Sequence, residues 1–480
     1  MQRHQHSLVL ILALGICCFS FWSARANEVT RPNVLFVAVD DLNDWIGVLG
    51  GHPQARTPNI DRLAKMGVLF TNAHTAAPAC NPSRVALMTG IPPHQSGVYH
   101  NNQRWRPALP DADTIPQTFQ KQGYWAAGSG KIYHGSYPDP ESWDTYMPSK
   151  TKQKYFDPAP PKKNINGLTK SHFDWGPLSK NVDDTKMGDA RTADWICKQL
   201  ENKHDRPFFL ACGFYRPHLP WYVPAHHFEA FPRSKVQLPT IKKNDLMDIP
   251  KAGITMAKPT GDHQAVVESD QWQAAVQGYL ASIAFVDRQV GRVIGALESG
   301  PNAKNTVIVF WTDHGWHLGE KQHWRKFTLW EEATRVPIIV VAPPGTPGLV
   351  QGTPKGKKCS APVSLMDLYP SLLELCGLPA KEGISGESLC QLLADPSASR
   401  TKPALTTHGR KNHALRDERW RYIRYSDGEE ELYDHQSDPQ EWHNLAGNSQ
   451  YDSVKNRLNK WLPKINAPGV NRGNATTKGP

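Results

Sequence analysis

The sequence has 480 residues, 39% of them hydrophobic, and a formal net charge of +10 at pH 7. That length and apolar content suffice for a large buried core and two or three domains, and the excess of positive charge favours anionic partners. The sequence has no zinc-ligand spacing, no arginine-rich arm and no aromatic-rich RNA-binding motif, so an acidic glycan fits the charge better than nucleic acid.

The first 26 residues have the pattern of a secretory signal peptide. Arg3 supplies a basic start, Leu8 to Trp22 form an almost unbroken apolar run, and the small-x-small pattern of a cleavage site ends at Ala26. An N-terminal membrane anchor is the alternative, but the apolar run is short for a bilayer span, and no later segment is long and apolar enough. We therefore expect cleavage after Ala26 and a secreted or periplasmic protein without a membrane segment.

Residues 27–399 are predicted to form one large α/β domain. Four short, continuous apolar runs are typical of buried strands in a parallel sheet, namely Val34–Val39, Phe208–Gly213, Thr306–Trp311 and Pro337–Val341. Amphipathic helices are expected between them, notably at Thr57–Met66 and Gln271–Leu297. The alternation of strands and helices predicts a large mixed, mostly parallel sheet with helices on both faces.

The pattern changes after residue 399. Strand-like runs at Trp420–Tyr425 and Glu431–Asp434 predict a small antiparallel sheet, and Asp452–Leu462 is expected to form a closing helix. We assign residues 400–465 to a smaller C-terminal α+β subdomain. The segment 466–480 is rich in Gly, Asn, Thr and Lys and is predicted to be disordered.

Polar residues follow the predicted central strands. Asp40 and Asp41 come directly after the first strand, Asp313 and His314 come after the third, and the second strand leads towards His218. Because ligands of open α/β sheets bind outside the carboxyl ends of the strands, these side chains should meet along one edge. Three carboxylates favour a hard cation, Ca²⁺ or Mg²⁺, over zinc.

The most informative segment is Cys80–Arg84, with the sequence Cys-Asn-Pro-Ser-Arg, followed by Thr89-Gly90. Pro82 favours an extended residue before it and a helix after it, which would place residue 80 at a helix N-terminus, where anions are stabilised. A buried cysteine before an ordinary helix is the alternative. The segment resembles the sulfatase motif C-x-P-S-R-x-x-x-x-T-G at every fixed position, and that family has an alkaline-phosphatase-like fold.

Further matches resemble the iduronate 2-sulfatase branch of the family. The Asp-His pair at 313–314 stands where many sulfatases have Asp-Asn, and the resemblance extends from about Arg31 to Pro439. It implies a catalytic set and a metal-binding set. The catalytic set is Cys80, Arg84, Lys131, His134, His218 and Lys326, and the metal set is Asp40, Asp41, Cys80, Asp313 and His314.

The resemblance also implies the chemistry. A separate formylglycine-generating enzyme would oxidise Cys80 to formylglycine, and one Ca²⁺ would bind beside it. The hydrated aldehyde, a gem-diol, would attack the sulfur of a sulfate ester while the arginine and two lysines of the catalytic set neutralise its oxygens. Protonated His218 or His134 would donate to the leaving oxygen. The substrate would be a sulfated sugar, with a 2-O-sulfate suggested by the iduronate-type matches.

Three other functions stay open at this point. A phosphonate or phosphate monoester hydrolase of the same superfold could act on a related anion. A cysteine hydrolase with Cys80 as a thiolate would need no calcium. A non-catalytic binder of sulfated glycans would keep the basic residues but has no use for the complete Cys80 motif.

The remaining cysteines and histidines carry weaker signals. Cys212 lies in an apolar strand and is expected to be buried, and Cys376 and Cys390 form a candidate disulfide. His226 and His227 match no motif, and we assign them no function.

Overall fold

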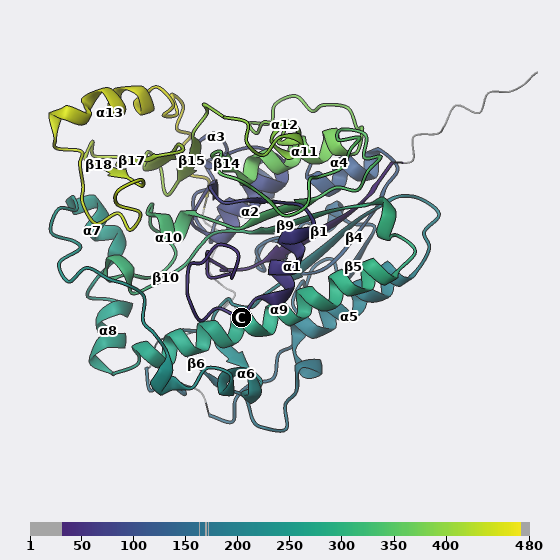
Figure 1. Ribbon diagram of the computed structural model, residues 1–480, viewed down its shortest axis with the longest axis horizontal. Helices are drawn as coiled ribbons and strands as arrows, with labels where there is room; N and C mark the ends of the chain where they lie inside the picture. Colours follow the sequence, from purple (N-terminus) through teal and green to yellow (C-terminus); the bar gives the residue numbers. More distant parts are fainter. Residues whose placement is uncertain (1–30, 163, 169, 171, 472–480) are drawn as a thin grey trace, which may run out of the picture. The chain divides into compact units, whose positions relative to one another are not determined.

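The computed structural model describes residues 31–162, 164–168, 170 and 172–471, so the expected signal peptide lies outside the described residues. The centre of the described part is an eight-stranded sheet with the order β13-β2-β12-β9-β1-β7-β4-β5 (Figure 1). In that order the strands are Lys357–Cys359, Val68–Phe70, Ile338–Val341, Thr306–Thr312, Asn33–Val39, Phe208–Phe214, Trp125–Gly130 and Thr145–Met147.

The direction of one predicted strand differs from expectation. β9, β1 and β7 are adjacent and parallel, as predicted. β12, which covers most of the predicted strand Pro337–Val341, instead runs antiparallel to both β9 and β2. A continuous apolar run indicates that a strand is buried on both faces, and burial of that kind is compatible with either direction.

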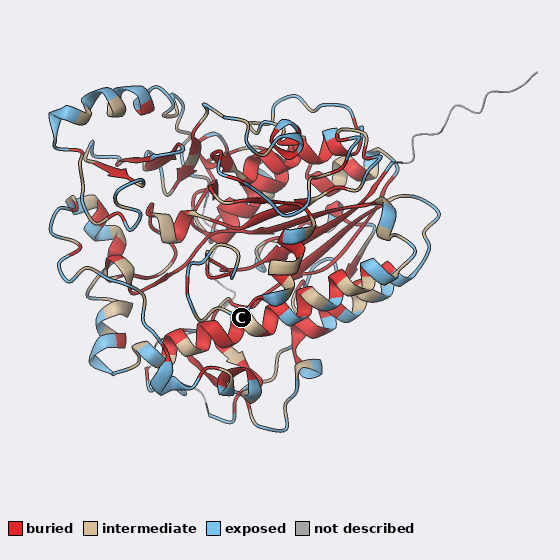
Figure 2. Cartoon of the chain, viewed as in Figure 1, coloured by how far each residue is buried: buried red, intermediate tan, exposed pale blue. Residues whose placement is uncertain are grey.

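Alternate residues of the central strands face two layers of core, as the pleat of a strand requires. In β1, Val37 and Val39 pack on one side of the sheet. Phe36 and Ala38 pack on the other. The strand is therefore buried on both faces (Figure 2).

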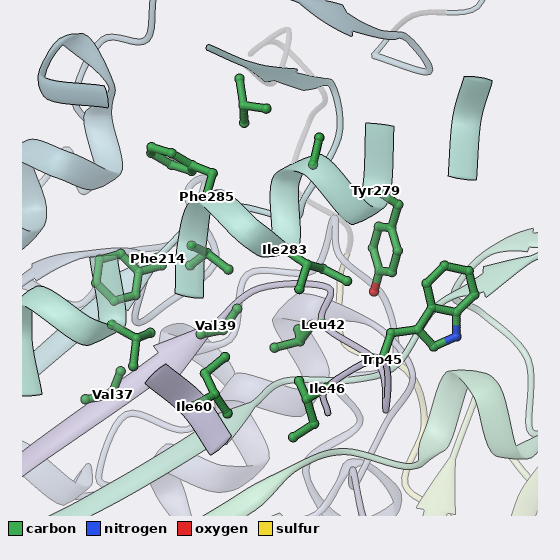
Figure 3. Close-up of a cluster of buried hydrophobic side chains, with 14 of the residues drawn as sticks. Val37, Val39, Leu42, Trp45, Ile46, Ile60, Phe214, Tyr279, Ile283 and Phe285 are labelled. Carbon is green, nitrogen blue, oxygen red and sulfur yellow. The ribbon is translucent and has the colours of Figure 1, made fainter. Parts of the chain in front are cut away.

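Helices cover each face of the sheet. On the face of Val37, α1 (Pro58–Met66), α5 (Gly188–Glu201) and α9 (Trp272–Ser299) supply the apolar side chains. Figure 3 shows part of this layer, with Ile283 of α9 above Val39 and Leu42. The opposite layer is formed mainly by α2 (Cys80–Thr89), α4 (Ile115–Lys121), α11 (Leu368–Leu375) and α12 (Cys390–Ala394).

The C-terminal region forms the predicted antiparallel sheet, with two more strands than the sequence indicated. Its strands are β15 (Ala404–Thr407), β16 (His413–Arg416), β17 (Trp420–Arg424) and β18 (Glu430–Asp434), and α13 (Asp452–Asn459) follows. Residues 466–471 differ from the prediction of disorder. The N–H groups of Ala467 and Val470 donate to the carbonyls of His94 and Gly97 at 2.8 and 3.0 Å, so these two residues are tied to the segment that follows α2.

The shorter elements connect these layers. The helices are α3 (Pro93–Ser96), α6 (Ala225–Glu229), α7 (Lys251–Ala257), α8 (Asp262–Glu268) and α10 (Glu331–Thr334), and the strands are β3 (Ala73–His74), β6 (Trp175–Pro177), β8 (Trp221–Val223), β10 (His317–Leu318), β11 (Trp324–Arg325) and β14 (Val363–Ser364). Among the described residues, no helix combines the length and apolarity needed to cross a membrane.

The described cysteines are all free thiols. The candidate disulfide between Cys376 and Cys390 is therefore not formed, although both thiols are buried. Cys212 is buried in β7, as expected.

Candidate active site

The carboxyl ends of β1 and β9 bring four predicted site residues together. The two strands pair in parallel along their whole length, so Asp40 and Asp41 meet Asp313 and His314 at one edge of the sheet. All four side chains are fully buried. Asp41 turns the chain at the end of β1 with a φ of 59°, in the left-handed region that Asp tolerates better than most residues. Its N–H donates to Asp313 Oδ1 at 3.2 Å.

Helix α2 places residue 80 at this edge. Ala79 is extended and Cys80 is the first residue of the helix, as the Pro82 signal predicted. Two hydroxyls fix the start of the helix, because Thr75 Oγ1 donates to Ser83 Oγ at 2.9 Å and Ser83 Oγ donates to the Asp313 carbonyl at 2.6 Å. Residue 80 therefore lies next to the carboxylates that follow the strands, while the Asn81 N–H of the same turn donates to Asn101 Oδ1 at 2.9 Å.

Four charged or polar groups surround the Cys80 sulfur. Sγ lies 3.1 Å from Lys326 Nζ, 3.3 Å from His314 Nε2, 3.8 Å from Lys131 Nζ and 4.0 Å from Asp41 Oδ1. Cys80 itself is 1% exposed. Burial raises the pKa of the thiol to about 12 against the opposing effect of the two lysines. An unmodified thiol would consequently be protonated at neutral pH.

Arg84 orients carboxylates rather than residue 80. Its Nε donates to Asp313 Oδ2 at 2.9 Å, one terminal nitrogen donates to Asp40 Oδ1 at 3.1 Å, and the other donates to the carbonyls of Lys131 and Ile132 at 2.7 and 3.0 Å. The guanidinium is fully buried, so these charge-assisted bonds act without competition from water. Arg84 thereby joins the ends of β1, β9 and β4.

The donor set fits a hard divalent cation. Asp41 Oδ2 is a buried carboxylate oxygen for which the described residues offer no hydrogen-bond partner, and such an atom is costly unless a ligand satisfies it. His314 Nδ1 lies 3.0 Å from the Gly315 carbonyl. The Nδ1 proton is therefore donated there, which leaves the Nε2 lone pair facing Asp41 and Asp313 at 3.4 Å from an oxygen of each. Three carboxylates with one imidazole suit Ca²⁺ or Mg²⁺.

The pKa values of the two adjacent carboxyls show where positive charge is lacking. Burial raises the pKa of Asp41 to about 7, with Asp40 and Asp313 adding to the rise and Lys326 opposing it. Burial also acts to raise the pKa of Asp40, but Lys131, His218 and Arg84 outweigh it and hold that pKa well below its usual value. Within the cluster, positive charge is therefore insufficient near Asp41 and sufficient near Asp40.

His218 approaches the cluster from the side of solvent. Its Nε2 lies 3.9 Å from Asp41 Oδ2, and its side chain is 31% exposed. Nδ1 is 2.6 Å from the Leu219 carbonyl, so Nδ1 carries a proton and Nε2 faces the site. Burial and the nearby Lys131 hold the pKa of His218 well below its usual value.

His134 is the second histidine of the predicted catalytic set. The contacts described for it are local, since Nδ1 accepts from the Ser136 N–H at 3.4 Å and the ring stacks on Tyr137 with centroids 5.9 Å apart. Burial and Lys131 lower the pKa of His134 to about 3. The ring is thus within reach of the charge at the centre, and His218 Nε2 lies 3.9 Å from Asp41 Oδ2.

Sequence reasoning did not find several residues that support the site. Gln153 Oε1 accepts from the N–H groups of Ile132 and Tyr133 at 3.2 and 3.0 Å and so fixes the segment that carries Lys131. The rings of Tyr215 and Trp316 lie 5.4 and 5.2 Å from the Nζ atoms of Lys131 and Lys326. A single glutamine or aromatic residue gives no local signal, although Trp316 lies in the segment after Asp313 that matched the family.

Comparisons with known proteins agree with this geometry. Residues 32–378 match the family described as Sulfatase, and residues 319–467 match the family described as N-sulphoglucosamine sulphohydrolase, C-terminal. The chain is 40% identical over 479 residues to a protein of Formosa agariphila named Sulfatase, and the alignment covers 95% of this chain and 92% of the relative. It is 31% identical over 407 residues to iduronate 2-sulfatase of Mus musculus, and the alignment covers 77% of this chain and 73% of the relative.

A solved structure extends the comparison to the fold. A protein in complex with its substrate D-glucosamine-2-N,6-O-disulfate superposes with a TM-score of 0.69 at 21% identity, covering 90% of this chain and 97% of that one. At that identity the likeness shows the fold alone. The match to the Sulfatase family spans more than half of the chain, and the relatives agree with it. The chain therefore belongs to the sulfatase family of the alkaline-phosphatase-like superfamily and is a sulfuric ester hydrolase.

Proposed function

We propose that this enzyme removes a 2-O-sulfate from an acidic sugar, as an iduronate 2-sulfatase does, with formylglycine at position 80 and one Ca²⁺. The observation that carries the proposal is the convergence of Lys326, Lys131 and His314 on the side chain of residue 80. Beside them lies the unpartnered oxygen of Asp41. The expected ligands of the ion are Asp40, Asp41, Asp313, His314 and residue 80.

Two groups supplied after synthesis would complete the site. A formylglycine-generating enzyme would supply the aldehyde, whose hydrate offers a hydroxyl nucleophile and a second hydroxyl that permits release of sulfate. When bound, the Ca²⁺ would act as a Lewis acid on the sulfate oxygens and on the nucleophile. Carboxylate-rich sites with hard cations are the usual setting for such chemistry.

The protein's own cations would balance the charge of the sulfate. Lys131 and Lys326 each lie within 4 Å of the Cys80 sulfur, so their ammonium groups can approach the oxygens of a sulfate held there. Because both are buried and positioned before the substrate arrives, their interaction with charge in the transition state is stronger than in water. Arg84 would keep Asp40 and Asp313 in place through its buried ion pairs.

His218 is the proposed proton donor to the leaving alcohol. Its Nε2 faces the cluster, and its side chain is the more exposed of the groups there, as expected for a residue between the reaction centre and the bound sugar. An anionic substrate next to the ring would favour the protonated form. An alkyl alcohol is a poor leaving group, so a proton donor is of most use with sugar sulfates.

A cavity beside the site supports an acidic sugar as substrate. It has a volume of about 330 Å³, adjoins the segment around Lys326, and is lined by Lys258, Arg325, Asp262 and His408 among others. Arg325 is already paired with Asp262 at 2.6 Å, so Lys258 would supply the charge for a carboxylate or a second sulfate on the sugar. This preference is consistent with the name of the mouse relative, iduronate 2-sulfatase.

The first test is the mass of the tryptic peptide Met66–Arg84 from protein produced together with a formylglycine-generating enzyme. We expect the aldehyde or its hydrate at residue 80. The second step compares kcat/KM on disaccharides sulfated at O2 of a uronic acid and at O6 of glucosamine, with the first preferred. An active enzyme with an unmodified thiol would favour the cysteine hydrolase, and faster turnover of a phosphonate ester would favour a phosphonate hydrolase. Tight glycan binding without turnover would favour the binder.

We also propose that the mature protein begins after Ala26 and is secreted or periplasmic. The support is the signal-like pattern of residues 1–26. N-terminal sequencing of protein recovered from the periplasm or medium should give Asn27 as the first residue. An intact Met1 in that fraction would contradict the proposal.

A further inference from the structure

A second cluster of possible metal ligands lies outside the site around Cys80. His226 and His227 belong to α6, and Asp184 begins a 3-10 helix that ends at Lys186. The Nε2 atoms of His226 and His227 lie 3.3 and 2.9 Å from the same oxygen, Asp184 Oδ1. Each of the three residues offers a donor atom within 4.8 Å of those of the other two. None of them has a role in the hydrolysis of the sulfate ester.

The spacing fits a tetrahedral ion. Zinc binds imidazole nitrogen and carboxylate oxygen at about 2.0–2.1 Å, so neighbouring ligand atoms of a tetrahedral site lie roughly 3.3 Å apart. The distances from His226 Nε2 and His227 Nε2 to Asp184 Oδ1, 3.3 and 2.9 Å, are close to that value. One neutral histidine ring already satisfies a carboxylate oxygen by donating one N–H to it. A hydrogen bond alone therefore gives no reason for the rings of two adjacent histidines to face the same oxygen, whereas a shared metal ion does.

The second oxygen of Asp184 supports a ligand rather than a simple pair. Oδ2 is buried and has no hydrogen-bond partner among the described residues, while Arg288 Nε stands 3.5 Å away. A carboxylate that binds zinc through one oxygen commonly has its other oxygen next to an outer group of this kind. Arg288 comes from α9, so it can hold Asp184 in place without occupying the position between the rings.

Burial around the cluster is graded. The His227 side chain is 7% exposed and packs edge-on against Phe285 of α9, with ring centroids 5.5 Å apart. The His226 side chain is 50% exposed. One ligand is therefore rigidly held by the core and another lies at the surface, which leaves an open side for water as a fourth ligand.

We propose that Asp184, His226 and His227 form a binding site for Zn²⁺, separate from the calcium site expected around Cys80. Bound zinc would join the 3-10 helix at 184–186 to α6 and hold both against α9. Helix α6 begins only seven positions after His218 in the chain. The ion would stabilise this part of the enzyme and takes no part in the hydrolysis. The proposal does not depend on the identity of the sulfated substrate.

The test is Co²⁺ and Zn²⁺ binding to the mature chain without an affinity tag, in saturating Ca²⁺. We expect one Co²⁺ per chain with the intense visible absorption of a four-coordinate site, and displacement by Zn²⁺. Zinc should also raise the Tm, by about 3 °C at a hundredfold excess over its Kd. Both signals should be lost in the double variant His226→Ala/His227→Ala and in Asp184→Asn, the second of which keeps the size of the side chain.

Three control variants separate this site from others. His443→Ala removes an exposed histidine elsewhere, and Arg288→Ala removes the ion-pair partner but no ligand, so both should bind Co²⁺ as the wild type does. Asp40→Asn should also retain the signal, because it alters only the site around Cys80. Equal Co²⁺ binding by the wild type and the double variant would overturn the proposal, and so would the absence of bound Co²⁺ or Zn²⁺ at a hundredfold molar excess over protein.

Discussion

Buried charged side chains gather around Cys80 and, in the C-terminal region, around Arg421. In the second cluster the Arg421 guanidinium forms ion pairs with both Glu331 and Glu441 and donates to the Leu329 carbonyl at 3.1 Å. Glu441 also accepts from His435 and from the Glu331 N–H, each at 2.9 Å. In this cluster, which we call the Arg421 cluster, the two carboxylates therefore find their partners within the protein.

The cluster around Cys80 differs in one respect that matters for function. It also contains buried ion pairs, through Arg84, Lys131 and Lys326, but here a carboxylate oxygen, Asp41 Oδ2, is left without a hydrogen bond from the described residues. Among the described residues of the Arg421 cluster, the buried atoms without one are donors, Arg416 Nε and Arg421 Nε, and both belong to ion pairs with Glu331 or Glu441. A buried unpaired acceptor costs free energy of folding. The Arg421 cluster therefore fixes α10 against β17, whereas the cluster around Cys80 leaves a carboxylate oxygen available for a ligand.

The largest expected effect separates the two clusters by activity. Cys80→Ala should lower the turnover of sulfate esters by roughly 10⁴-fold or more, because the nucleophile and its activating groups act as a unit. Its Tm should stay within a few degrees of the wild type, since only a small buried side chain is shortened. Sulfate release and thermal melts measure the two properties. Residual turnover above one part in a hundred would remove residue 80 from the nucleophile's role.

Removal of the metal should have the next largest effect. Chelation of Ca²⁺, or the variant Asp41→Asn, should lower kcat by about 10²–10³-fold, because positive charge that offsets the sulfate is lost. Added Ca²⁺ should raise the Tm of the wild type but not that of Asp41→Asn. A wild-type enzyme that keeps full activity and the same Tm after exhaustive chelation would contradict the assignment of Asp41 Oδ2 as a ligand.

His218→Ala tests the part of the site that faces the leaving group. We expect a loss of about 10²-fold or more in kcat on alkyl and sugar sulfates, and a loss below about tenfold on nitrophenyl sulfate, whose leaving group needs little protonation. Steady-state kinetics on both substrates gives the comparison. His134→Ala serves as the matched histidine control. A larger loss of kcat on sugar sulfates in His134→Ala than in His218→Ala would make His134 the proton donor. Equal losses of His218→Ala on both substrates would exclude proton donation.

Arg421→Met should act on stability and not on chemistry. It leaves Glu331 and Glu441 buried without their shared cation, which typically costs about 3–5 kcal/mol when one partner of a buried pair is removed. Chemical denaturation should show that loss, while kcat/KM per folded molecule stays near the wild-type value. If the variant fails to fold, Arg421→Lys should restore part of the stability. Loss of kcat/KM without loss of stability would contradict the division between the clusters.

The smallest effect concerns a buried neutral group in the C-terminal sheet. Burial lowers the pKa of His413 to about 4, opposed by the hydrogen bond that His413 Nε2 donates to Asn466 Oδ1. Between pH 4 and about pH 6.5, His413 is protonated in the unfolded chain but neutral in the folded protein. The free energy of unfolding should therefore fall as the pH drops through this range. The contribution is at most about 3 kcal/mol. His413→Gln should flatten the decline in denaturation measured from pH 7 to pH 4, and an unchanged slope would contradict it.

Much of the site could be predicted from local sequence. Continuous apolar runs fix where the central strands lie, and the residues directly after them, Asp40-Asp41 and Asp313-His314, must then share one sheet edge. Residue 80 could be placed at a helix start because Pro82 constrains the backbone on both sides. These inferences depend on a few adjacent residues, whose conformation is set by short-range sterics.

Other features were decided by the tertiary structure. Three features have no local signal, namely the antiparallel direction of β12, the free thiols of Cys376 and Cys390, and the hydrogen bond of Ala467 to His94. The meeting of Asp184 with His227 joins residues 43 positions apart. Such contacts depend on how whole elements pack, which periodicity along the chain does not encode. Short-range sterics and hydrophobicity, read from the sequence alone, fixed the positions of the central strands and the start of the helix at Cys80, whereas packing decided which distant side chains met around them.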